Sequence, residues 1–152
     1  MSLRFHYTLI PTGSGIPSLG GRSVRPRPLV PAVVLIGPTH GVAREALLDT
    51  GADDTVFPEF LATSVGINLG ALPSGSLRSA AGGHLPVRYA MVSLRLTDGH
   101  EQREWPATVA FTSARLWRPI LGFAGCLQFF TATFHGDREE VELTVNGLYP
   151  GT

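Results

Sequence analysis

The chain has 152 residues, of which 43% are apolar and 16% charged, a balance typical of one globular domain and not of a disordered chain. Twelve basic and twelve acidic residues cancel without forming a block of either sign, so we expect neither nucleic acid nor a membrane surface as a partner. Eighteen glycines and twelve prolines among short apolar runs favour a mostly β fold with many turns.

The single cysteine, Cys126, allows no internal disulfide, and its apolar neighbours favour a buried and inert thiol. No apolar run, Ala32 to Gly37 included, is long enough to span a bilayer. Residues 1–20 contain no hydrophobic signal core. We therefore expect a cytoplasmic protein.

The first strand is predicted at Leu3 to Ile10, where apolar and polar side chains alternate. Residues 11–28 are rich in Gly and Pro, which predicts a loop or linker. We place a boundary here, so that residues 1–28 form an N-terminal extension and residues 29–152 form the domain proper. Whether the extension is a removable pro-segment stays open.

The domain proper begins with a predicted hairpin of Leu29 to Ile36 and Ala43 to Asp49, joined by a Gly/Pro turn. The hairpin delivers Asp49 to a loop that Gly51 allows to turn sharply. A carboxylate between buried flanks is costly unless it is hydrogen-bonded, and such positions are often functional. A short helix is predicted after the loop, from Pro58 to about Val65.

A second hairpin is predicted with strands Ser76 to Ser79 and Leu85 to Leu96. Its tip, Ala80 to Gly83, consists of small residues with low packing and low backbone cost, so we expect it to be mobile. A further strand is predicted from Trp105 to Phe111, where apolar residues alternate with others.

The segment Ile120-Leu121-Gly122 has two apolar residues before a glycine, and a short helical turn is predicted after it, over Phe123 to Phe130. Leu47-Leu48-Asp49-Thr50-Gly51 has the same order with an acid added. This likeness indicates an approximate internal duplication in which only one half carries the acid. Two last strands are predicted at Thr131 to His135 and Glu140 to Val145.

In this order the pieces resemble the retropepsin-like aspartic proteases, single-domain relatives of pepsin that include the retroviral proteases. The resemblance rests on Asp49-Thr50-Gly51-Ala52-Asp53-Asp54-Thr55-Val56, on the glycine-tipped hairpin and on Ile120-Leu121-Gly122, and covers roughly residues 29–146. Asp-Thr-Gly alone occurs by chance in on the order of a few per cent of chains this long. The extended match with both partner elements is far more specific.

The resemblance implies a closed, mostly β fold with one or two short helices, and an active site at the interface of a homodimer. The chain has no second Asp-Thr-Gly or Asp-Ser-Gly, so a pair of acids requires two copies, and dimers are the commonest oligomers. The family interface uses the chain ends, so we expect the strands Leu3 to Ile10 and Glu140 to Val145 to pair in the dimer sheet.

The implied activity is hydrolysis of peptide bonds in a polypeptide substrate, with no metal ion and no cofactor. Two carboxylates about 3 Å apart share one proton because they do not both ionise, so one activates water while the other protonates the scissile group. The pair titrates as a unit. Ala52 has no hydroxyl to donate to it, unlike Ser or Thr in relatives, so we expect activity near pH 5–6, roughly.

The resemblance assigns roles to individual residues. Asp49, Thr50 and Gly51 form the catalytic motif, with the Thr50 hydroxyl locking the two active-site loops together unless it is an ordinary turn threonine. The hairpin tip corresponds to a flap that closes over the peptide, and its plainer interpretation is an exposed turn. The predicted substrate-binding residues are Ala52, Asp53, Asp54, Ala80, Ala81, Gly82, Gly83, Trp117, Arg118 and Ile120.

Some of these assignments have alternatives of similar weight. Asp53 and Asp54 would accept backbone N–H groups of the substrate, or else belong to a solvated turn. Trp117 is either a pocket residue or a core residue. Arg118 is expected in a pocket or in a salt bridge.

The sequence departs from the retroviral pattern directly after Gly122. Many relatives have an arginine there that pairs with the acid equivalent to Asp53, whereas this chain has Phe123. Either another arginine, such as Arg115 or Arg118, replaces it, or the dimer is held differently and more weakly.

Two other classes of function remain open at this point. One is a β domain that keeps the fold for peptide binding or dimerisation and barely cleaves. The other is a hydrolase of another class, which Ser79 and Ser113 do not support because neither has the context of a nucleophile elbow. The five histidines show no metal-ligand spacing, so no metal site is expected.

Overall fold

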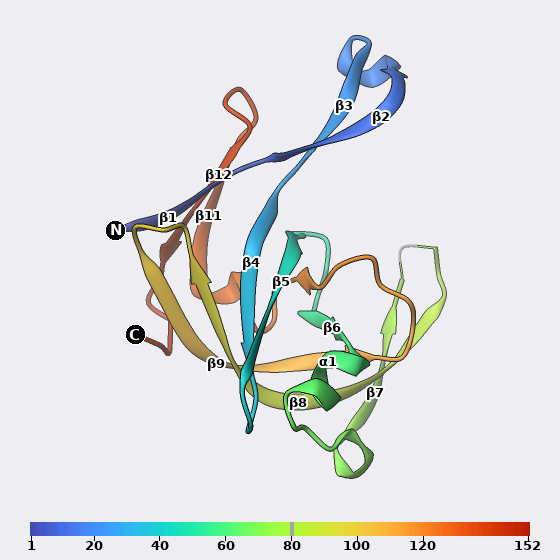
Figure 1. Ribbon diagram of the computed structural model, residues 1–152, viewed down its shortest axis with the longest axis vertical. Helices are drawn as coiled ribbons and strands as arrows, with labels where there is room; N and C mark the ends of the chain where they lie inside the picture. Colours follow the sequence, from blue (N-terminus) through green and yellow to red (C-terminus); the bar gives the residue numbers. More distant parts are fainter. Residues whose placement is uncertain (80) are drawn as a thin grey trace.

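The computed structural model describes residues 1–79 and 81–152, and Figure 1 shows their arrangement. Most regular structure is β, in a seven-stranded sheet, a three-stranded sheet and a two-stranded hairpin. The only α-helix of the described chain is α1 (Glu59–Ser64), with short 3-10 turns η1 (Pro17–Leu19), η2 (Leu69–Ala71) and η3 (Leu127–Phe129). This is the mostly β fold that the sequence predicts. No helix in these residues is long and apolar enough to cross a membrane.

The seven-stranded sheet closes on itself. Its order is β4, β5, β10, β6, β9, β8, β7, and β4 also pairs with β8, so that the strands from β4 round to β8 form a ring from which β7 extends. The strands are β4 (Leu29–Ile36), β5 (Gly41–Leu48), β6 (Val56–Pro58), β7 (Ser74–Arg78), β8 (His84–Thr97), β9 (Gln102–Thr112) and β10 (Ile120–Leu121). The closed ring holds β5, β10 and β6 side by side, and these three strands carry the loops discussed below.

The core fills the inside of this ring because apolar residues alternate along its long strands. Trp105, Phe57 and Phe111 are its largest fully buried side chains, and burial of each contributes about 2–3 kcal/mol. The indole Nε1 of Trp105 donates to the carbonyl oxygen of Gly125 at 2.8 Å, which ties the core to the segment after β10. Helix α1 corresponds to the helix predicted after the Asp49 loop, and its Leu61 packs into this core.

The three-stranded sheet joins the two ends of the chain. Its order is β1 (Ser2–His6), β12 (Glu140–Val145) and β11 (Phe130–His135), and both pairings are antiparallel. The terminal strands thus pair with each other, but within one chain and not across a dimer as we expected. Leu3 and Phe5 are buried against this sheet and the core, so the pairing has enough apolar surface to form inside one subunit.

The prediction of a loop over residues 11–28 is wrong. Strands β2 (Thr8–Ile16) and β3 (Arg22–Arg27) form an antiparallel hairpin that projects from the body of the molecule (Figure 1). Prolines fit because both strands of a two-stranded ribbon are edge strands. Gly13, with φ 74°, lies where the register shifts, and Gly20 and Gly21 turn the chain with positive φ. The predicted first strand accordingly divides between β1 and β2.

Other elements differ from expectation mainly in length. The helical turn predicted over residues 123–130 is limited to η3, and the apolar strand before Gly122 has only the two residues of β10. Cys126 is buried as predicted, and this burial raises the pKa of its thiol to about 12. At neutral pH the thiol is therefore protonated and a poor nucleophile.

Candidate active site

The candidate site is built where one strand inserts between two others. β10 lies between β5 and β6, parallel to β5 through the pair Leu121–Leu48 and antiparallel to β6 through the pair Ile120–Val56. The chain leaves β5, passes through residues 49–55 and returns as β6, so this loop must bridge the inserted strand. Both apolar-apolar-turn segments end at the same edge of the sheet, because they lie in neighbouring parallel strands.

Asp49 is the first residue of this loop and is held by main-chain hydrogen bonds. Its N–H donates to the Leu121 carbonyl oxygen at 3.1 Å, and its own carbonyl oxygen accepts from the Ala52 N–H at 3.2 Å. Its carboxylate Oδ1 accepts from the Gly51 N–H at 2.9 Å. A β-carbon on Gly51 would lie 3.3 Å from the same oxygen, so glycine permits this close approach. The half-buried carboxylate is therefore oriented by its own turn.

The segment after β10 forms hydrogen bonds with the second half of the loop. Phe123 N–H donates to the Ala52 carbonyl oxygen and Ala124 N–H to the Asp53 carbonyl oxygen, both at 2.9 Å. Thr55 is fully buried, and its Oγ1 accepts from the Gly122 N–H at 3.3 Å. These bonds fix the acidic loop to the chain after β10 without using any charged side chain.

A groove of about 360 Å³ lies between this loop and the hairpin of β7 and β8. Its lining residues are Asp49, Gly51, Ala52, Asp53, Asp54, Val56, Leu77, Arg78, Ser79, Leu85, Leu116 and Ile120. The structure thus brings six predicted site residues into one cavity. Thr50 does not line it and is exposed on the loop, where a lock across a dimer axis stays a prediction.

The hairpin of β7 and β8, at whose tip the flap is predicted, lines this groove through residues near its tip, Leu77, Arg78, Ser79 and Leu85. Ser79 N–H donates to the Gly83 carbonyl oxygen at 2.8 Å, which closes the turn, and Gly82 has φ 85°. Ala81, Gly82 and Gly83 are exposed and do not line the groove, and Ala80 lies outside the described residues. The mobility of the tip stays a prediction.

Sequence reasoning missed the apolar walls of the groove. Leu77 and Leu85 are directly paired across β7 and β8, and Leu116 faces them from the segment before β10. The alternation of Leu77 with polar neighbours was a usable signal, because side chains of one face alternate with those of the other. Leu116 had no such signal, because it lies in an irregular segment.

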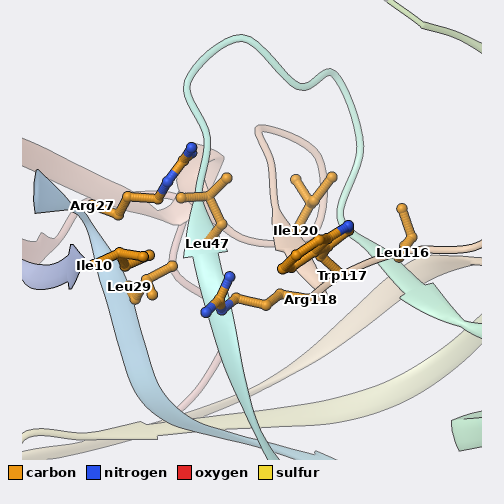
Figure 2. Close-up of a pocket in the computed structure, with 8 residues that line it drawn as sticks. All are labelled: Ile10, Arg27, Leu29, Leu47, Leu116, Trp117, Arg118 and Ile120. Carbon is orange, nitrogen blue, oxygen red and sulfur yellow. The ribbon is translucent and has the colours of Figure 1, made fainter. Parts of the chain in front are cut away.

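A second pocket of about 430 Å³ adjoins the groove, and Leu116 and Ile120 line both. Figure 2 shows Ile10, Arg27 and Leu29 on one side of Leu47, with Leu116, Trp117 and Ile120 on the other. Trp117 is 93% exposed, so the core interpretation of this residue is wrong. Arg118 lines the pocket and also donates from Nε to Glu45 Oε1 at 2.5 Å, so it lies both in a pocket and in a salt bridge, while its contact with substrate stays a prediction.

The charges of the loop are unusual because they lack a basic partner. Within the described chain Asp53 forms no ion pair, and Arg118 is engaged with Glu45. Phe123, which replaces the arginine of retroviral relatives, is 60% exposed. Burial, followed by the neighbouring charge of Asp53, raises the pKa of the Asp54 carboxyl. The groove is thus acidic, and Arg78 is the only basic residue among the described residues that line it.

Among residues 1–79 and 81–152, no three His, Cys, Asp or Glu side chains gather as a set that could hold a metal ion.

Comparison with known proteins adds one match. The family described as aspartyl protease matches residues 33–123, a range that includes the Asp49 loop, the β7–β8 hairpin and Gly122. No curated protein sequence matches the chain.

Proposed function

Since this chain belongs to the aspartyl protease family, in its retropepsin-like form, we propose that two copies of it form one aspartic endopeptidase. The two Asp49 carboxylates would lie together at the dimer axis and form the catalytic dyad. The observation that carries the proposal is that Asp49, oriented by the Gly51 N–H, lines an open groove as the only acid of an Asp-Thr-Gly motif in the chain.

The chemistry requires both carboxylates. One Asp49, ionised, takes a proton from a water molecule whose oxygen attacks the carbonyl carbon of the scissile peptide. The other Asp49, protonated, donates to the carbonyl oxygen and so stabilises the tetrahedral intermediate. Transfer of a proton to the amide nitrogen then allows the C–N bond to break, which gives a free carboxylate and amine. The two acids share one proton throughout and titrate as a pair.

The substrate is proposed to bind extended between the loop and the flap, where it can form strand-like hydrogen bonds to both. Asp53 and Asp54 provide acceptors on the floor, while the flap tip closes from above. Leu77, Leu116 and Ile120 would surround apolar side chains next to the scissile bond. We therefore expect a preference for apolar residues at that position.

A quenched peptide library tests this proposal. We expect wild-type protein to cleave it and Asp49→Asn to lose at least about 10³-fold in kcat/KM, while the exposed control Asp137→Asn cleaves normally. Sedimentation under the same conditions should show dimers. Turnover that persists in Asp49→Asn would refute the mechanism, and a strictly monomeric active enzyme would refute the shared dyad.

A peptide-binding or dimerisation module that barely cleaves is the second candidate. It is favoured by Phe123 in place of the expected arginine, because the described chain offers Asp53 no ion pair. Dimers that bind peptides but cleave none between about pH 3 and 7 would select this alternative.

Location and processing are proposals as well. We propose a reducing cytoplasm, in keeping with a lone, buried cysteine. We also propose that residues 1–28 are an extension of the protease domain that the active protein retains, because its Leu3 and Phe5 belong to the core. Full activity of the uncleaved chain is the expected result.

A further inference from the structure

A third cavity, of about 400 Å³, adjoins the groove at Asp54, which lines both of them. We call it the Asp54 hollow. Its characteristic side chains are Asp54, Tyr89, Met91, Pro106, Gln128 and Phe129. Among the described residues that line it, Asp54 is the only one with a charge.

The walls of the hollow are apolar surfaces held open by well-packed neighbours. The Tyr89 ring lies against β7, where a β-carbon on Gly75 would come within 2.7 Å of its Cε2 atom. Gln128 accepts a hydrogen bond through Oε1 from the Gly125 N–H at 2.9 Å, which fixes the opposite wall. Met91 is 67% exposed at the rim, although thioether side chains are usually buried. The hollow is thus a formed surface with an apolar rim.

The single charge in the hollow has no counter-charge. Asp54 takes part in no ion pair within the described chain, and burial and the charge of Asp53 both raise the pKa of its carboxyl. Tyr89 lines the same hollow as Asp54, and burial, followed by the Asp54 charge, raises the pKa of its phenol. A cation placed between them would relieve the acidic crowding of Asp53 and Asp54.

We propose that the Asp54 hollow binds a lysine or arginine side chain of the polypeptide substrate, at a position beyond the residues next to the scissile bond. The inference rests on the proposed function, because Asp54 lines both the hollow and the groove that holds Asp49. The aliphatic stem of the side chain packs on Met91 and Phe129, and its charged end faces the Asp54 carboxylate. An extended substrate thereby gains a second anchor distant from the catalytic carboxylates.

Position-scanned peptides test the proposal, with lysine, norleucine or glutamate placed in turn along one cleaved sequence. Norleucine keeps the stem of lysine and removes its charge. At one distal position we expect lysine to lower KM about tenfold relative to norleucine, with kcat nearly unchanged, and glutamate to raise it. The variant Met91→Lys, which places a cation at the rim, should abolish this preference.

The control is Phe60→Lys, which adds the same charge at a similarly exposed position on α1, and should preserve the preference for lysine. Equal KM values for lysine and norleucine at every distal position would overturn the proposal, as would an unchanged preference in Met91→Lys. If the wild type cleaves nothing, fluorescence anisotropy of the same labelled peptides decides the matter. Lysine-dependent binding lost in Met91→Lys supports the hollow although the protease proposal fails, and its absence refutes the hollow.

Discussion

A β-carbon on Gly122 would lie 2.2 Å from the carbonyl oxygen of Asp54, well inside van der Waals contact. The chain after β10 therefore approaches the acidic loop more closely than any other residue type allows. The same approach lets the Gly122 N–H reach Thr55 Oγ1. Glycine at the end of the second apolar segment is thus a packing requirement of the interlocked strands, independent of any dimer.

We predict that Gly122→Ala is among the most damaging single substitutions in this chain. The added methyl group meets backbone, which cannot rotate away, so the loop and β10 must separate. We expect a loss of about 2–4 kcal/mol in the free energy of unfolding, measured by urea denaturation.

The matched control is Gly136→Ala, in the turn between β11 and β12, where a β-carbon meets nothing within 4 Å. Its free energy of unfolding should change by less than about 0.5 kcal/mol. Comparable losses in both variants would show that the close approach at Gly122 is not the cause of the lost free energy of unfolding.

Thr55→Val tests the hydroxyl that accepts from Gly122. Valine keeps the shape of this fully buried side chain but leaves the Gly122 N–H without its acceptor. We expect a loss of about 1–3 kcal/mol in the free energy of unfolding. The exposed strand residue Thr133→Val is the control, and a loss of the same size there would assign the effect to strand propensity instead.

The sequence predicted the parts of the site that depend on local pattern. A strand leading to Asp49, an apolar strand before Gly122 and a short helix after the loop follow from local pattern and turn chemistry, and the structure has all three as β5, β10 and α1. The likeness of the two apolar segments indicated a duplication but not their pairing, and it is the structure that places Leu47 and Leu48 beside Ile120 and Leu121 in parallel strands.

Features that depend on distant neighbours were not predictable. The hairpin of β2 and β3 has a loop-like composition, and only its two-stranded geometry makes Pro11 and Pro26 acceptable. Trp117 looked equally suited to core and pocket, since hydrophobicity does not tell which face a residue of an irregular segment takes. The Asp54 hollow joins Met91 to Phe129 across several elements, and no local motif marks it.

Asp98 gives the fold a pH-dependent contribution that can be isolated. Burial alone would raise its pKa, but backbone N–H groups of Glu101, His100 and Arg4 donate to its carboxylate and hold the pKa below the ordinary 3.8. A depressed folded-state pKa stabilises the fold above the unfolded value, and this stabilisation is lost as pH falls through the folded value. Asp98→Asn should therefore weaken the fold more at pH 7 than at low pH.

Urea denaturation of wild type and Asp98→Asn, at neutral pH and again below the ordinary carboxyl range, measures this difference. The exposed Asp137→Asn serves as the reference for loss of one negative charge. A penalty for Asp98→Asn that is the same at both pH values would mean that the contribution is steric and not ionic.

Position 52 is expected to set the acid limit of catalysis, if the proposed dyad forms. Ala52 lines the groove beside Asp49 and cannot donate a hydrogen bond from its side chain. In Ala52→Thr a hydroxyl can donate to the dyad and favour its charged form. Because the doubly protonated dyad has no base to activate water, the acid limb of kcat should move to lower pH, by roughly half to one unit.

The isosteric variant Ala52→Val separates this effect from side-chain size, since valine has the volume of threonine without its hydroxyl. The kcat of Ala52→Val is measured over the same pH series with the same peptide. The acid limb of its pH profile should coincide with that of the wild type. An equal shift in both variants would attribute the change to crowding of the groove. An acid limb unchanged in Ala52→Thr would mean that the hydroxyl does not reach the dyad, and that the mild pH expected of the wild type has another origin.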